Sequence, residues 1–335
     1  MSVVRETFAL TSPWPTIDPF LFSMHHLDHY PRAEGTTQAP AADLAGREIG
    51  QDFANKDGWN MYHGRTVPGF PQHPHRGFET VTVVLEGVVD HTDSLGASAR
   101  YGDGDTQWLT AGAGVAHAEM FPLRYADRDN PLELFQIWLN LAPEDKKAEP
   151  NFKMFWAEDT PIVTRTDAEG RESRFRVVAG ELDGVVPPTP PQNSWAARPQ
   201  NEVAIWQITM APGATTELPT ASAEAIRTVY VHRGSLQIED TTLSDQGAVV
   251  HADQAVTITA GPQGASLMLL QGRPIGAPVV QHGPFVGNTK ADILNAFNDY
   301  QQGTFGRWTL PTSDPVNPQD SGRFARYPDG TISTP

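Results

Sequence analysis

Hydrophobic positions along the chain fall in short runs in which Val, Thr and aromatic residues alternate with polar residues. Gly or Pro separates one run from the next, and the sequence contains 29 residues of each type. Alternation of this kind is typical of half-buried strands, because successive strand side chains point to opposite faces of a sheet. We therefore expect an all-β fold made of many short strands and turns.

Helical periodicity is concentrated in residues 289–303, "TKADILNAFNDYQQG". Thr289 is placed to cap the N-terminus of a helix, and Gly303 is placed to end it. The apolar side chains that would share one face are Ile293, Phe297 and Tyr300. The pattern predicts a short C-terminal helix, followed by a Pro-rich polar tail over residues 307–335.

An internal repeat indicates a duplicated domain. "TVTVVLEG" at residues 80–87 resembles "TVYVHRG" at residues 228–234, and "TAG" follows each of them, at residues 110–112 and 259–261. Two matches in register predict two copies of one β-domain, near residues 50–145 and 200–285.

The composition of the chain argues against several classes of protein. The chain has no Cys, which excludes disulfides and thiolate metal sites, and its formal net charge of −16 disfavours direct binding to nucleic acid. Its longest apolar runs are too short to span a membrane, and the N-terminus lacks the apolar stretch of a signal peptide. We expect a cytoplasmic protein without membrane contact.

The candidate chemistry lies in two pairs of side chains, each with one residue between its members. His73 and His75 flank Pro74, and His117 and Glu119 form a second pair further along the chain. In a strand, residues two apart point to the same face, so each pair would project both ligands to one side. Pro74 cannot donate a ladder hydrogen bond, which places the first pair on an edge strand or at a strand start. Together the four side chains can converge on one cation.

Nitrogen and oxygen ligands without sulfur suit Fe, Mn, Ni, Co, Cu or Zn. Four protein ligands in an octahedral shell leave two open positions, which favours a redox iron site over a closed structural zinc site. The second copy of the repeat has non-ligating residues at the corresponding positions in an alignment without gaps: Ala221, Ala223, Ser266 and Met268. We therefore expect one transition-metal ion per chain, in the first copy.

At these residues the sequence resembles the pirin family of the cupin superfamily. The matching segments are "HPHRGFETV", "DSLG", "GDTQWLTAGAGVAHAEM" and "GRPIGAPVVQHGPFVGNT". The resemblance implies a bicupin, with two antiparallel β-barrels (double-stranded β-helices) packed face to face and Fe in the N-terminal barrel alone. The metal ligands of the family carry over to His73, His75, His117 and Glu119.

The expected organisation follows from the repeat and the resemblance together. It has five parts: residues 1–150, a metal-binding cupin domain with an N-terminal arm; 151–199, a connecting segment; 200–288, a metal-free cupin domain; 289–306, the helix; and 307–335, the tail.

Several polar residues near the motifs have weaker predicted roles. Glu79 occupies the position of the glutamate in the general cupin pattern and is the second choice as a ligand, after Glu119. His63 is a possible neighbour of the ligands, and Arg76 could pair with a carboxylate. The segment "MHHLDHYP" (residues 24–31) is expected to hold structural loop histidines.

Two functions from different classes are consistent with this reading. In the first, the protein resembles quercetin 2,3-dioxygenases and opens a flavonol with O2, with Glu119 taking the proton of the substrate hydroxyl. In the second, it is a non-enzymatic regulator that acts through a protein partner, and the oxidation state of its Fe alters the surface near the site.

Overall fold

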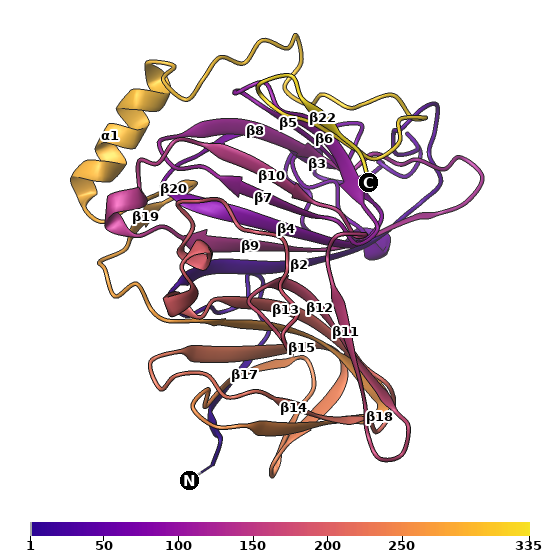
Figure 1. Ribbon diagram of the computed structural model, residues 1–335. Coiled ribbons are helices and arrows are strands. Elements are labelled where there is room, and N and C mark those ends of the chain that lie inside the picture. The colour runs from indigo at the N-terminus through magenta and orange to yellow at the C-terminus, as the bar shows by residue number, and fades with distance from the viewer. Residues whose placement is uncertain (1) are drawn as a thin grey trace. The chain divides into compact units, whose positions relative to one another are not determined.

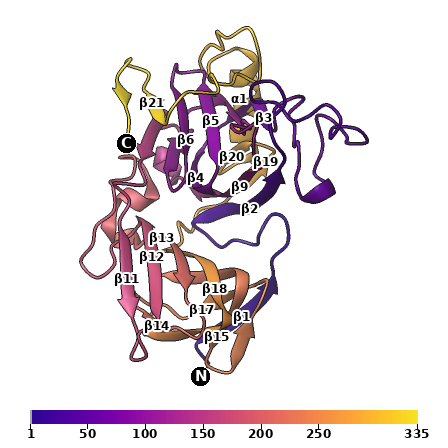
Figure 2. The ribbon, with the colours of Figure 1, turned by 90° about the vertical axis from the view of Figure 1, so that its right-hand side faces the viewer.

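The computed structural model describes residues 2–335, and these divide into two compact units (Figures 1 and 2). Unit 1 comprises Met1–Met24, Ile137–Ala142 and Glu158–Gly276, and unit 2 comprises His25–Gln136, Pro143–Ala157 and Ala277–Pro335. Antiparallel sheets dominate both units, and the all-β prediction is confirmed.

Unit 1 is built on a nine-stranded sheet with the order β1-β17-β15-β18-β13-β12-β11, in which β14 also pairs with β18 and β16 with β15. Its strands are β1 (Val4–Ala9), β11 (Ile162–Thr166), β12 (Glu172–Ala179), β13 (Ala204–Met210), β14 (Thr215–Leu218), β15 (Ile226–Ile238), β16 (Thr241–Leu243), β17 (Gln246–Val250) and β18 (Val256–Gly272). Two 3-10 turns, η3 (Trp195–Ala197) and η4 (Pro199–Asn201), precede β13.

Unit 2 holds a six-stranded sheet, β22-β21-β6-β5-β8-β3, and most of a five-stranded sheet, β10-β7-β4-β9-β2. The strands are β2 (Phe20–Tyr30), β3 (Gly69–His75), β4 (Phe78–Glu86), β5 (Val88–Asp93), β6 (Ser98–Gly102), β7 (Thr106–Thr110), β8 (Val115–Met120), β9 (Asn130–Asn140), β10 (Asn151–Phe155), β21 (Phe324–Arg326) and β22 (Ile332–Ser333). The division between the units falls within β2 and β9. A separate hairpin, β19 (Val280–His282) with β20 (Phe285–Gly287), and the turns η1 (Lys56–Gly58) and η2 (Pro143–Asp145) complete the unit.

The predicted helix is confirmed as α1 (Lys290–Gln301). Thr289 caps it, and its hydroxyl accepts from the backbone N–H of Asp292 while the Asp292 carboxylate accepts from the backbone N–H of Thr289. This reciprocal pair satisfies two backbone donors that the first turn of a helix leaves open. Gly303 follows with a φ of 76°, a conformation that favours glycine. Among the residues that the model describes, no helix combines the length and apolar character that crossing a membrane requires.

The two units are discontinuous in sequence, unlike the contiguous ranges expected from the repeat. The N-terminal strand β1 pairs with β17 of unit 1, so it is a strand of that unit's sheet and does not act as an arm of the first copy. The segment expected to connect the copies contributes β10, β11 and β12 to the sheets. These placements depend on hydrogen bonds between strands that are far apart in the sequence, and composition cannot predict such pairings.

The Pro-rich tail is an ordered part of unit 2. Its strand β21 pairs antiparallel with β6 (Figure 2), which extends the six-stranded sheet. The fully buried guanidinium of Arg100 on β6 donates twice to the carboxylate of Asp90, at 2.7 Å for both bonds. The same guanidinium donates to backbone carbonyls of the tail, those of Asn317, Pro318, Gln319 and Ser321. One buried cation therefore holds the tail by its backbone.

We expect Arg100→Met to release the tail. The substitution leaves the buried Asp90 carboxylate without its cation, and loss of one partner of a buried pair costs about 3–5 kcal/mol. Denaturant unfolding should show a loss of that order, and limited proteolysis should cut residues 307–323 much faster than in the wild type. Arg326→Met, at an exposed position of β21, is the matched control. Equal protection of the tail in Arg100→Met and the wild type would contradict the assignment.

Candidate metal centre

Two neighbouring strands carry the predicted ligands. β3 is the last strand of the six-stranded sheet, next to β8, so it is the edge strand that Pro74 predicts, and the ladder places His73 directly opposite His117. The register shifts between Phe70 and His73, as at a β-bulge, and such an irregularity re-aims the side chains beside it. Phe70 is opposite Glu119 in the same ladder. Pairing of two strands from separate parts of the sequence thus brings both predicted pairs to one place.

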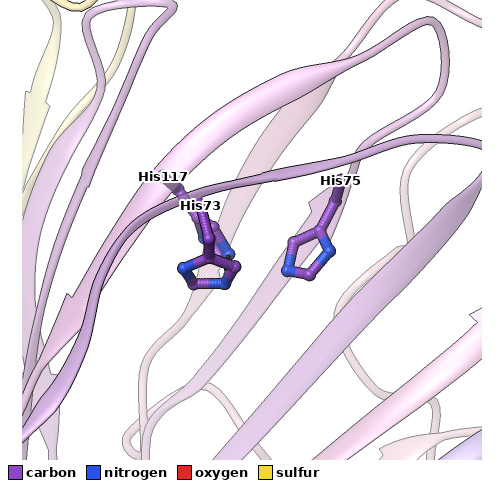
Figure 3. A group of neighbouring side chains, drawn as sticks. All are labelled: His73, His75 and His117. Carbon is purple, nitrogen blue, oxygen red and sulfur yellow. Dashed lines mark hydrogen bonds between the residues drawn. The ribbon is translucent and has the colours of Figure 1, made fainter. Parts of the chain in front are cut away.

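The three histidines converge on one point. Each of His73, His75 and His117 offers a ring nitrogen, and these nitrogens all lie within 4.8 Å of one another (Figure 3). The Nε2 atoms of His73 and His117 are 3.0 Å apart. His73 Nδ1 donates to the carbonyl of Pro71 at 2.9 Å, which leaves the lone pair of His73 on Nε2.

Burial keeps these rings neutral. Desolvation lowers the pKa of His73 to about 4, and it lowers the pKa values of His75 and His117 well below the usual range. A neutral imidazole is the form that binds a metal ion, because protonation removes the lone pair. His75 and His117 are buried, whereas His73 is partly exposed. The solvent-facing side of the group is therefore the side of His73.

Glu119 lies beside the three histidines but does not belong to their group. Its Oε2 is 3.7 Å from His117 Nε2. The carboxylate accepts from Gln136 Nε2 at 3.1 Å and from the Thr82 hydroxyl at 3.4 Å. Burial raises the pKa of Glu119, although the neighbouring His91 and these two hydrogen bonds act in the opposite direction. Thr82 on β4 and Gln136 on β9 come from distant segments, and the sequence pattern did not single them out.

The other residues named from sequence lie outside the group. The buried Glu79 accepts from the Thr110 hydroxyl at 2.6 Å within the five-stranded sheet. His63 is exposed and its Nδ1 contacts the Gly50 carbonyl, while Arg76 pairs with the carboxylate of Asp299 on α1 at 2.6 Å. The ion pair of Arg76 connects α1 to the chain just after the HPH segment (residues 73–75).

All of the segment "MHHLDHYP" except its last residue, Pro31, lies in β2, so the prediction of loop histidines is wrong. Alternation along the strand buries His26 and Asp28 on one face. The Tyr62 hydroxyl donates to Asp28 at 2.7 Å and lies 2.8 Å from His26 Nδ1. The Tyr62 ring stacks on Phe70, so this buried network supports the strand that carries the ligands.

The donor set fits a transition metal. Adjacent ligands of an octahedral ion, each about 2.1 Å from it, are about 3.0 Å apart. The two facing Nε2 atoms have this separation. His117 Nδ1 is buried without a hydrogen-bond partner among residues 2–335. It can carry the single proton of a neutral ring, which leaves the lone pair of Nε2 free to bind an ion. Three neutral imidazoles and a nearby carboxylate are a donor set that could hold Fe, Mn, Ni, Co, Cu or Zn.

Family models and known proteins resemble this chain over more than half of its length. The family model described as "Pirin" matches residues 36–139, and that described as "Pirin C-terminal cupin domain" matches residues 205–306. The chain is 33% identical over 240 residues to a Pseudomonas aeruginosa protein named "Putative quercetin 2,3-dioxygenase", covering 71% of this chain and 80% of that protein. It is 35% identical over 246 residues to Pirin-1 of Arabidopsis thaliana, covering 71% and 78%. A crystal structure of quercetin 2,3-dioxygenase from Acinetobacter baumannii aligns with a TM-score of 0.67 at 26% identity, covering 86% of both chains.

We expect the purified chain to bind one divalent transition-metal ion, and His117→Ala to reduce its affinity at least a hundredfold, because one of the three imidazoles is lost. An ion that binds the folded chain alone raises its melting temperature, so scanning calorimetry with and without Ni²⁺ or Fe²⁺ measures the effect. His63→Ala removes an exposed imidazole outside the group and is the matched control. A metal-induced shift that survives in His117→Ala would contradict the site.

The buried network under β3 predicts a pH effect on stability. Desolvation lowers the pKa of His26 from 6.5 to about 3. Between these values the unfolded chain takes up a proton that the folded chain excludes, so the stabilisation from neutral His26 falls as the pH drops below 6.5. Burial raises the pKa of Asp28 to about 6, and this opposes the loss between about pH 6 and 4.

The change that isolates His26 is His26→Asn, which keeps a hydrogen-bonding side chain but cannot titrate. Its free energy of unfolding, measured on metal-free protein from pH 7 to 4.5, should fall less steeply than that of the wild type, with a difference of a few kcal/mol over the range. Leu27→Asn, at an exposed position of the same strand, removes no titratable group and should retain the wild-type slope. Identical slopes for His26→Asn and the wild type would refute the explanation.

Proposed function

This chain belongs to the pirin family of the cupin superfamily, and from that premise we propose that it is a metal-dependent dioxygenase that opens the heterocycle of a flavonol such as quercetin with O2. The observation that carries the proposal is the convergence of His73, His75 and His117 within 4.8 Å. The names of the relatives from Pseudomonas and Acinetobacter support the substrate class.

In this proposal the three histidines hold one ion, and iron is the metal that we propose. When bound, such an ion supplies Lewis acidity toward a substrate oxygen and redox chemistry toward O2. The partly exposed side at His73 is where the substrate would enter, and the ring of Phe70, 6.3 Å from the His73 ring, offers an aromatic surface beside it. The buried side, at His75 and His117, excludes water from the nitrogens.

Glu119 has two proposed roles that use the same carboxylate: fourth ligand to the ion, and acceptor of the proton of a flavonol hydroxyl. A carboxylate held by a cation is a weak base, so the two roles compete. Gln136 and Thr82 hydrogen-bond to this carboxylate beside the histidines, and burial raises its pKa. Both features favour the proton acceptor, because a raised pKa strengthens the base and the two anchors hold it at a defined place.

The proposal predicts that the iron-loaded protein consumes quercetin aerobically, followed as loss of the flavonol absorbance. His73→Ala should abolish turnover together with metal binding. Glu119→Gln should retain the metal and lower kcat by about 10²–10⁴-fold, the usual contribution of a general base. Metal content is measured on every preparation.

Glu86→Gln, which neutralises an exposed carboxylate at the end of β4, is the control and should have wild-type activity. Loss of the metal in Glu119→Gln would assign Glu119 to the ligand set instead of the proton transfer. A metal-loaded wild type that turns over no flavonol with any of the six candidate metals would contradict the enzyme and favour the partner-binding regulator.

A further inference from the structure

The barrel of unit 1 contains a buried cation among apolar side chains. Arg227, Val229 and Val231 alternate along β15 and so share one face, and both valines belong to the core cluster of this unit. Arg227 is therefore directed to the interior, and its exposed fraction is 0%. The ladder places it opposite Gln271 on β18.

The guanidinium of Arg227 is incompletely paired. Its Nε donates to Gln271 Oε1 at 2.8 Å and its Nη2 donates to the carbonyl of Pro219 at 2.6 Å, but its Nη1 has no hydrogen-bond partner within residues 2–335. Both acceptors are neutral, so the positive charge has no counter-ion there. Desolvation lowers the pKa of Arg227 to about 10, which leaves the group charged at neutral pH. Buried charges in proteins are normally paired, because an uncompensated one is costly.

A cavity of about 460 Å³ adjoins this cation. Its wall includes apolar residues, among them Val186, Pro187 and Val203, and charged residues such as Glu202, whose carboxylate already accepts hydrogen bonds from Ser222 and Arg273. Trp206 also lines it, and Trp206 Nε1 is a second buried donor without a partner in the described part of the chain. The volume is in the range of small-molecule sites, which combine apolar walls with a few polar anchors.

We propose that this cavity binds a small organic carboxylate, whose charged end pairs with Arg227 and whose apolar body lies along the Pro- and Val-lined wall. A carboxylate supplies the acceptor that Nη1 lacks and the negative charge that the guanidinium lacks, and Trp206 Nε1 offers a further donor. The apolar wall disfavours a fully hydrated inorganic anion, because such an ion would lose its water without replacement contacts. This site lies within unit 1, and it does not depend on the proposed dioxygenase.

The site is tested by calorimetric titration of the full-length, metal-loaded chain with four carboxylates: acetate, butanoate, benzoate and 3-phenylpropanoate. We expect saturable binding of at least one of the larger members, at least tenfold tighter than binding of the corresponding primary amide. Arg227→Met keeps the length of the side chain and removes its charge, and it should weaken binding at least tenfold. Arg174→Met, at an exposed position of β12 in the same unit, is the matched control and should bind like the wild type.

Carboxylates can also ligate a metal ion, so the titration is repeated with metal-free His117→Ala, in which the affinity should be unchanged. The comparison of acid with amide uses the wild type and stays decisive if Arg227→Met does not fold. Equal affinity for acid and amide, full retention of binding in folded Arg227→Met, or competition by chloride at the same concentration would each overturn the proposal, as would the absence of binding by all four acids.

Discussion

Desolvation of three imidazole rings is the constraint on which the candidate centre depends. His75 and His117 are buried by the pairing of β3 with β8, and burial keeps their nitrogens unprotonated and available. Burial takes the nitrogens of these rings away from water, which costs free energy. A bound cation would offset part of this cost, so metal affinity and the stability of the first barrel are expected to be linked.

The sequence predicted those parts of the structure that short-range periodicity determines. Alternation of polar and apolar residues gave the strands, Thr289 and Gly303 gave the ends of α1, and the spacing of the HPH segment gave the edge strand and the convergence of its histidines. The contacts that the sequence could not predict depend on pairing between distant segments. Gln136 and Thr82 reach Glu119 from β9 and β4, and no local pattern connects these positions.

The alignment of the two repeats without gaps is correct in one part and wrong in another. The segments 80–86 and 228–234 lie in corresponding strands, β4 and β15. Further along, however, Ser266 and Met268 alternate with Leu267 and Leu269, which face the core of unit 1. Ser266 and Met268, the predicted counterparts of His117 and Glu119, are therefore on the opposite face of β18 from the core residues. Arg227 is a charged residue that does enter this barrel, and a search directed at metal ligands could not find it.

The discontinuous composition of unit 2 has a consequence for biosynthesis. The barrel that carries the histidines begins at residue 25, yet strand β21 of its six-stranded sheet is supplied by residues 324–326. Most of unit 1 is translated after the strands that carry the histidines and before β21, so this sheet lacks β21 while unit 1 is being synthesised. In the sheet order, β21 follows β6 at the end remote from β3, so β3 and β8 can pair and bring their histidines together before β21 is added.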